Sequence, residues 1–482
     1  FVPGANGSQA QYLIPIQSKK DVLSSSFQAL TAKDGINIGY TGNTSLGISE
    51  KTNFAPRFGF AYQATPKLVV RGGYGLFYGG FENRGYSPNI GENYPFQFTF
   101  SFFNPDPEHP IALTNPDGSA CAKVVTLETG FTCSPLNPTL VNASGLSLEG
   151  IQYNYVTPYT QSANFILQYA LTENDSLWIG YVGSFARHLE TFVGSNEVSQ
   201  ILPPGLNRAN YIPFPDFSYG QSYAATEGNS YYHSLQTNYE HRFKSGLQVL
   251  ANYTYSKVRA DAKDLLNGNV SGYRAPYLPG FGIQGDYGQA DFDVRNVFHL
   301  SGTYALPFGN GQRWVNSGGA ANAILGGWTT NWIVTLQDGQ PYGLGCSIST
   351  TTTLGCVPLV VPGQSDLAGP HNVNQWLNPK AFANPTVATT IGQSDYSPLG
   401  GEIPNVVGPG FHRLDFSLFK EFRTSERTHL ELRTEVFNLT NHPNFAIPSD
   451  NTFSDTNFGK ITSTRDNPSD PRQIQFALKF YF

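Results

Sequence analysis

The sequence predicts an all-β protein, an antiparallel transmembrane β-barrel of about twelve strands with long extracellular loops. Three observations favour this fold over a soluble one. Apolar and polar side chains alternate over many segments, the connections between these segments are alternately short and long, and the chain ends in large apolar residues. The prediction covers residues 1–482 as one barrel domain.

The last segment, "RQIQFALKFYF" at 472–482, shows the alternation most clearly. Successive side chains of a strand point to opposite faces, so one face of this strand is apolar and the other is polar. We expect the apolar face to contact lipid. The terminal pattern resembles the insertion signal of outer-membrane barrels, which the barrel-assembly machinery reads, and its residues here are Phe476, Leu478, Phe480 and Phe482.

The same alternation recurs along the chain in segments of roughly 10–15 residues, which is the length of a transmembrane strand. Strands of a soluble sandwich average about five to six residues. A propeller would show a regular blade repeat, which the sequence lacks. The twelve expected strands are 11–17, 54–63, 66–79, 157–171, 175–188, 230–243, 246–258, 288–306, 327–340, 410–423, 428–440 and 472–482.

The connections alternate between tight turns and long Gly-, Pro-, Asn- and Ser-rich links. Outer-membrane barrels have short periplasmic turns and long external loops, so the long links are expected outside the cell. The connection 307–326 is longer than the scheme requires of a periplasmic turn. The alternating segment 94–102 would break the up-and-down order as a span, so we expect it to be a β-extension of an outer loop.

Composition excludes a helical membrane protein and does not favour a nucleic-acid-binding protein. No apolar run approaches the ~18 residues of a membrane-spanning helix, and the mean hydropathy is −0.28. Charged residues are 13% of the chain, against about 25% in soluble globular proteins. The net charge is −6 and there is no basic block, so nucleic acid is not an expected partner.

The four cysteines form two close pairs in loop sequence, and their spacing does not match C-x-x-C metal or redox motifs. Two local disulfides in an oxidising compartment are the simplest interpretation, and four free thiols are the alternative. The predicted pairs are Cys121 with Cys133 and Cys346 with Cys356.

Charged residues gather on the polar parity of two neighbouring strands near the chain end. We expect a cross-strand ladder of opposite charges that stiffens the lumenal wall. Exposed pairs of this kind contribute about 0–1 kcal/mol each. The alternative is a polar contact surface for a plug or a passing solute. The residues are Arg413, Asp415, Glu421 and Arg423 on one strand, and Glu431, Arg433 and Glu435 on its partner.

Catalytic and cofactor motifs are absent from the sequence, and we predict that the protein is not an enzyme. There is no G-x-S-x-G elbow, no paired-histidine metal motif, and the glycines of "RGGYGLFYGG" lack phosphate-loop spacing. Glycine in such a strand leaves room for a neighbouring group. The cluster Asp286, Asp291 and Asp293 lacks an EF-type calcium pattern. Two of these aspartates share a parity, and we expect them to line the lumen or its mouth; a Ca²⁺ site at an external loop is the alternative.

Several stretches resemble the C-terminal barrel of TonB-dependent receptors, especially the Oar-like group. They are residues 53–78, 286–314 ("DYGQADFDVRNVFHLSGTYALPFGNGQRW"), 432–445 ("LRTEVFNLTNHPNF") and the last strand. The resemblance implies ligand import through the outer membrane of a Gram-negative bacterium, energised by TonB through a plug domain. Family members carry a TonB box, a plug and usually about 22 strands or more, so we expect this chain to be the C-terminal portion of a longer receptor.

Three functions are consistent with the sequence. The first is uptake of an unidentified ligand that external loops and lumen select, with outer-membrane lipid and TonB as further partners. The aromatic-rich outer loops suit such binding, because aromatic rings give large contact area at low entropic cost. The second is a passive porin, and the third is an adhesion scaffold that displays its loops.

Overall fold

The fold was analysed in a computed structural model. It describes residues 1–482 except 5–8, 21–22, 49, 80–90, 92, 99–107, 109–113, 115–117, 122–127, 129–136, 199, 221, 245, 262–286, 317, 347–357, 365–367, 393–402, 424–427 and 466–470.

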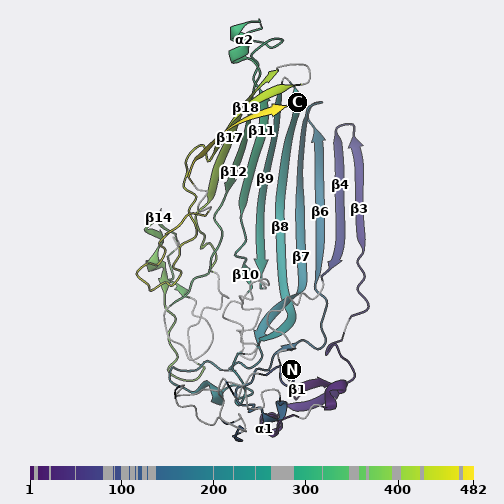
Figure 1. The fold of residues 1–482 in the computed structure, drawn as a ribbon, viewed down its shortest axis with the longest axis vertical. Coiled ribbons are helices and arrows are strands. Elements are labelled where there is room, and N and C mark those ends of the chain that lie inside the picture. The colour runs from purple at the N-terminus through teal and green to yellow at the C-terminus, as the bar shows by residue number, and fades with distance from the viewer. Residues whose placement is uncertain are drawn as a thin grey trace.

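One large antiparallel sheet dominates the described chain, and its strands follow one another in chain order (Figure 1). This arrangement confirms the predicted up-and-down order of antiparallel strands. The eleven strands are β3 (Arg57–Thr65), β4 (Leu68–Tyr78), β6 (Tyr159–Ala170), β7 (Asp175–Gly194), β8 (Ser222–Lys244), β9 (Leu247–Ala260), β11 (Asn296–Ala305), β12 (Trp328–Gln337), β17 (Phe411–Arg423), β18 (His429–Phe437) and β19 (Gln473–Tyr481). Two short strands join the sheet from the side, namely β10 (Gly288–Gln289) beside β9 and β5 (Gly150–Ile151) beside β8.

The sheet is not closed into a barrel. In the part of the chain that the structure describes, β3 and β19 are the two ends of the strand order, and each pairs on one side only. The sequence predicted about twelve strands in this chain as part of a larger barrel, and the large sheet contains eleven of them in chain order.

The expected first span at 11–17 is wrong. β1 (Gln11–Pro15) pairs in parallel with β2 (Asn37–Thr41) in a separate two-stranded sheet, beside α1 (Ser25–Lys33). Figure 1 places this unit at the end of the molecule opposite the short turns. The alternation of β1 is real, but Tyr12 and Ile14 are buried against Phe27 in a compact core rather than facing lipid.

The predicted β-extension at 94–102 is also wrong where it is described. Residues 94–98 form a turn and a bend, and Tyr94 is buried in the same core as Tyr12 and Phe27. Residues 99–102 lie outside the described part of the chain.

The register across the sheet separates two faces. Residues that pair directly across antiparallel strands share a face, so one row can be followed from strand to strand. One row, from β4 to β17, is mostly apolar: Leu68, Tyr169, Leu177, Tyr239, Ala251, Leu300, Val334 and Leu414. The row one residue away is mostly polar: Val69, Gln168, Trp178, Asn238, Asn252, His299, Thr335 and Arg413.

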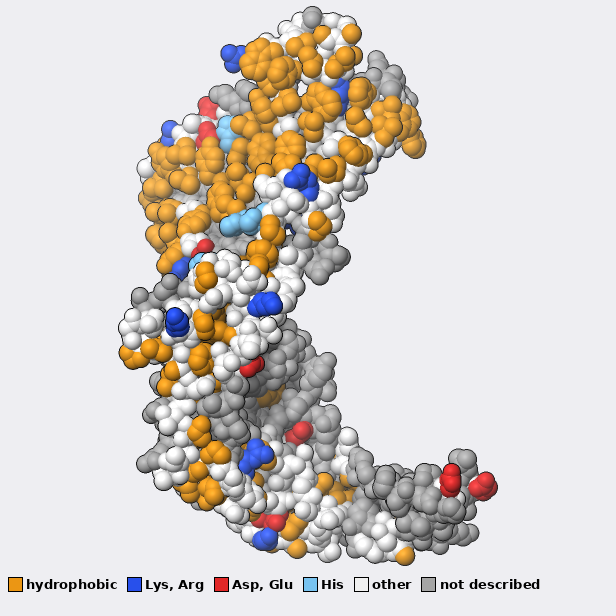
Figure 2. Space-filling view, turned by 90° about the vertical axis from the view of Figure 1, so that its left-hand side faces the viewer, with side chains coloured by type: hydrophobic (Ala, Val, Ile, Leu, Met, Phe, Trp, Pro, Cys, Tyr) orange, Lys and Arg blue, Asp and Glu red, His pale blue; other side chains and the backbone are white. Residues whose placement is uncertain are grey.

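The apolar face is exposed, which is the reverse of a water-soluble protein. On β19, Phe476 is 74% exposed and Leu478 is 68% exposed. The upper part of the molecule, where the strands lie, shows a broad apolar surface in Figure 2. No helix among the described residues is long and apolar enough to cross a membrane. The exposed rows therefore match the lipid-facing side of an outer-membrane sheet.

Two glycines of the apolar face make room for aromatic rings. Gly72 lies opposite Phe60, and a Cβ at Gly72 would come within 2.4 Å of the Phe60 ring. Gly302 lies opposite Trp332, with a corresponding distance of 2.3 Å. In both places the ring lies over the glycine, as the sequence suggested for the glycines of "RGGYGLFYGG".

The long connections pack into two buried clusters at the loop end. One joins the N-terminal unit to Tyr94, to residues 141–148 and to residues 214–217, around Phe27 and Leu148. The other joins the β12–β17 and β18–β19 connections around Leu377, Phe382 and Phe458. The small elements of this region are η1 (Ile16–Lys20), η3 (Pro138–Leu140), η4 (Arg208–Asn210), β13 (Leu359–Val360), β14 (Ala368–Asn372), β15 (Gln375–Leu377), η6 (Pro379–Ala381) and β16 (Phe382–Ala383).

The connection 307–326, which is unusually long for the short-turn side, contains α2 (Ala320–Leu325). Figure 1 places α2 at the end of the sheet that carries the short turns and the C-terminus.

The two faces predict opposite responses to a charge. Leu167→Arg puts a cation on the apolar row, and we expect it to lower the free energy of unfolding in lipid vesicles by about 2–4 kcal/mol. Gln168→Arg is the matched control on the polar row, and we expect a change within about 0.5 kcal/mol. Urea unfolding followed by gel mobility measures both. Equal losses in the two variants would contradict the assignment of the faces.

Candidate functional site

The polar face of the sheet is joined by hydrogen bonds between neighbouring strands. Asn238 donates from Nδ2 to Asn252 Oδ1 at 2.6 Å, linking β8 to β9. His299 Nδ1 lies 3.2 Å from Thr335 Oγ1, linking β11 to β12. These contacts link polar side chains of neighbouring strands across one face of the sheet.

The charged residues near the chain end all lie on the polar parity of β17 and β18, but their ion pairs run along each strand. Arg413 Nε lies 2.9 Å from Asp415 Oδ1 within β17. Within β18, Arg433 lies 2.8 Å from Glu431 and 3.5 Å from Glu435. The alternating pattern of the sequence had predicted pairs across the two strands instead.

The register explains this difference. Glu421 lies directly opposite Glu431, so the cross-strand neighbours there have the same charge. Arg433 lies opposite Phe419, and its guanidinium is 5.4 Å from that ring centroid. Arg423 pairs with His429 at the end of the ladder, and its side chain lies outside the described part of the structure. Whether these charges stiffen the wall or contact a solute stays a prediction.

The "NLTNHPNF" stretch, which carried part of the family resemblance, is a turn built on asparagine side chains. Asn438 is buried and adopts a positive φ of 51°. Its Oδ1 accepts from the His442 backbone N–H at 3.0 Å, and its Nδ2 donates to the His442 carbonyl at 2.9 Å. Asn444 Oδ1 accepts from the His412 backbone N–H at 2.8 Å, which ties the loop to the start of β17.

The cysteines are described in part. Cys121 and Cys346 are both disulfide-bonded. Cys133 and Cys356 lie outside the described residues, so the two local pairings stay predictions.

The aspartate cluster is also described in part. Asp286 lies outside the described residues. Asp293 is buried, and its carboxylate accepts from the Val258 backbone N–H at 2.9 Å and from Gln289 Nε2 at 2.8 Å. Within the described chain, no group of three His, Cys, Asp or Glu residues is placed to hold a metal ion.

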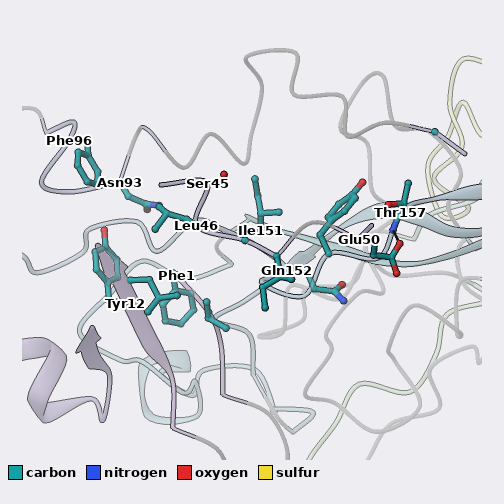
Figure 3. A pocket seen from close by; sticks show the side chains of 16 residues that line it. Phe1, Tyr12, Ser45, Leu46, Glu50, Asn93, Phe96, Ile151, Gln152 and Thr157 are labelled. Atoms are coloured by element: carbon teal, nitrogen blue, oxygen red, sulfur yellow. Dashed lines mark hydrogen bonds between the residues drawn. The ribbon is translucent and has the colours of Figure 1, made fainter. Parts of the chain in front are cut away.

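A pocket of about 500 Å³ opens at the loop end, between the N-terminal unit and the outer ends of the strands (Figure 3). The chain approaches it from segments far apart in sequence: 1–2, 12–13, 45–48, 50, 79, 93–96 and 151–157. Phe1, Leu46 and Ile151 give it an apolar wall, while Glu50 and Gln152 contribute polar groups.

The polar groups around the pocket are already oriented by the protein. Glu50 Oε2 accepts from the Thr157 backbone N–H at 2.8 Å. Asn93 is fixed by two hydrogen bonds to the Glu149 backbone, at 2.8 and 2.9 Å. Tyr155 contributes a phenol, which is neutral at pH 7 in any case, and burial, followed by the nearby Glu190 carboxylate, raises its pKa further. The pocket therefore presents an apolar wall, one carboxylate and a neutral phenol.

Comparison with known protein families decides the family. Residues 7–475 match the model described as "Outer membrane beta barrel domain". The chain belongs to this family. A comparison with curated proteins found no match.

This outer membrane beta barrel domain is also similar to solved outer-membrane transporters. They include the transporter YddB from Escherichia coli (11% identity, TM-score 0.42, 89% of this chain and 40% of that one). The ferric citrate transporter FecA in its unliganded form gives 10% identity, a TM-score of 0.36, and coverage of 89% and 38%. BauA, the ferric preacinetobactin receptor from Acinetobacter baumannii, is 12% identical with a TM-score of 0.37, and the match covers 89% of this chain and 36% of that one. The chain spans no more than about two fifths of these structures.

The pocket of this outer membrane beta barrel domain was not predicted from the sequence. Its walls come from residues more than a hundred positions apart, and no motif marks them. The segment 11–17, which contributes Tyr12 and Leu13 to the pocket, does carry a signal in the sequence. Its alternation predicts a strand, but that strand lies in the small N-terminal sheet and not in the large one.

The pairing within β18 predicts how the wall responds to loss of its cation. The Glu431 side chain is only 8% exposed, so Arg433→Met leaves a nearly buried carboxylate without its partner. We expect the free energy of unfolding to fall by about 1–3 kcal/mol. Adding Glu431→Gln should recover part of that loss, since the orphaned charge is then removed. Equal stability of the single variant and the wild type would contradict the pair's contribution.

Proposed function

We propose that this chain is the barrel of an Oar-like, TonB-dependent outer-membrane receptor, which takes up a ligand captured at its loop end. The observation that carries the proposal is the pocket at the loop end, placed over a sheet whose inner face is polar. A ligand released from the pocket would move along hydrogen-bonding groups rather than along lipid. The proposal assigns no catalytic residue and no cofactor.

The open edges of the sheet fit a larger assembly. Both β3 and β19 have unpaired backbone groups on one side in the described chain, and in lipid such groups cost several kcal/mol each. We infer that further strands of the full-length receptor pair with these edges and that its plug domain, which TonB pulls, fills the lumen. Insertion into the outer membrane by the barrel-assembly machinery belongs to the same proposal.

The pocket's chemistry narrows what it can hold. An apolar wall beside one carboxylate favours a ligand with an aromatic or aliphatic group next to a hydrogen-bond donor or a cation. A small, fully hydrated solute would gain little from such a wall.

The proposal predicts uptake that depends on TonB. The full-length protein is produced in a Gram-negative host, and uptake of ferric siderophores, oligosaccharides, peptides and cobalamin is compared with and without TonB. We expect one class to enter only when TonB is present. Entry of small solutes without TonB would instead show a passive pore. Adhesion to surfaces without any uptake would show a scaffold.

The pocket itself is tested by filling it. Ile48 lines the pocket, and Ile48→Trp should weaken binding of the ligand found by the uptake panel about tenfold, a loss of about 1.4 kcal/mol. Ile391→Trp enlarges an exposed apolar residue of another outer connection and is the matched control. Titration of the detergent-extracted protein measures both. Equal binding by the two variants would place the ligand elsewhere.

A further inference from the structure

The β11–β12 connection, residues 307–327, carries features that neither the sheet nor the uptake proposal uses. It leaves the short-turn end of the sheet, where outer-membrane proteins face the periplasm. Three of its large apolar side chains are exposed: Trp314 at 48%, Ile324 at 66% and Leu325 at 49%. Exposed apolar groups that gather on one surface mark contacts with a protein or a membrane.

The connection is folded on itself rather than extended. The Asn310 backbone N–H donates to Asn322 Oδ1 at 2.7 Å, and the Gly311 N–H donates to Asn316 Oδ1 at 2.7 Å. Gly309 packs closely against Gly326, since a Cβ at Gly309 would come within 2.8 Å of the Gly326 Cα. The position of Trp314 relative to α2 is thus defined by hydrogen bonds and close packing.

Lys420 attaches this unit to the lipid-facing side of the sheet. It lies opposite Trp328, on the same parity as Leu418 and Phe416. Its side chain is buried, and Nζ donates to the Ala323 and Ile324 carbonyls at the C-terminal end of α2, at 2.5 and 3.0 Å. The Trp328 indole donates to the Ile324 carbonyl at 2.8 Å, on the same face.

A lysine on the lipid-facing side of a strand restricts how deep that position can lie in the membrane. Its charge is costly at the bilayer centre and nearly free of cost at the interface, where long cationic side chains reach towards polar groups. Lys420 meets this condition by donating to helix carbonyls at the edge of the sheet. Lys420 and Trp328 therefore hold the C-terminal end of α2 beside the lipid-facing row of the sheet.

We propose that residues 307–316 and 318–327 lie against the periplasmic leaflet of the outer membrane and anchor the barrel to phospholipid. Trp314, Ile324 and Leu325 enter the interface, continuing the apolar surface of the strands. Arg313, whose guanidinium lies 5.4 Å from the Trp314 ring centroid, faces the lipid phosphates. Tryptophan and arginine at one level are characteristic of membrane–water interfaces. This placement does not depend on whether the barrel is a receptor or a pore.

The test uses the protein's own fluorescence in vesicles of phosphatidylethanolamine and phosphatidylglycerol, with or without bromine on the acyl chains. Acyl bromine quenches tryptophan that lies in the membrane. Wild type and Trp314→Phe are compared, so the difference isolates one of the five tryptophans. We expect Trp314→Phe to lower the emission in ordinary vesicles. In brominated vesicles Trp314 is already quenched, so the same substitution should lower the emission by at least threefold less.

Trp376→Phe is the control, because Trp376 packs in the loop-end cluster with its indole bonded to the Val407 carbonyl. Its removal should subtract the same emission in both kinds of vesicle. If Trp314→Phe behaves like this control, Trp314 lies in water and the proposal is overturned.

A second pair of variants keeps every tryptophan. Ile324→Glu places a charge in the proposed interface and should reduce bromine quenching to the level of Trp314→Phe. Gln312→Glu adds the same charge at an exposed polar position of the connection and should leave quenching unchanged. Unchanged quenching in both would overturn the placement of α2 at the membrane.

Discussion

The eleven strands of the large sheet obey one constraint, that their backbone groups bond to neighbouring strands while one face of the sheet contacts hydrocarbon. In lipid no water is available to satisfy a free N–H or carbonyl, so the strands must form a continuous ladder. The register of the eleven strands shows this ladder from β3 to β19. Once the ladder is fixed, the apolar rows turn outward and the polar rows turn inward together.

At the loop end the apolar residues are buried within the protein, unlike those of the large sheet. There the connections meet water, and their apolar residues are buried in two clusters around Phe27 and Leu377. One molecule therefore contains a sheet with exposed apolar residues and a cap with buried ones. The pocket lies where the two meet, since the cap shapes its wall and the strands lead away from it.

Local pattern was sufficient to predict the sheet, because a strand with two different faces shows its alternation in the letters themselves. The same pattern misled at 11–17, since Tyr12 and Ile14 alternate as a lipid-facing strand does but face a protein core. Alternation shows that the two faces of a strand lie in different environments, but it does not show whether the apolar face contacts lipid or a protein core. The pocket and the pairing of Arg433 depend on which residues become neighbours in space, and a single sequence does not show that.

The ion pairs along β18 bear on how such a strand enters a membrane. Glu431, Arg433 and Glu435 are two residues apart in turn, so they share a face as soon as the segment is extended. Arg433 thus meets its counter-charges before β18 meets β17 or β19. A hairpin added to a growing sheet would bring this cation already neutralised, and insertion need not wait for a neighbouring strand to supply the opposite charge.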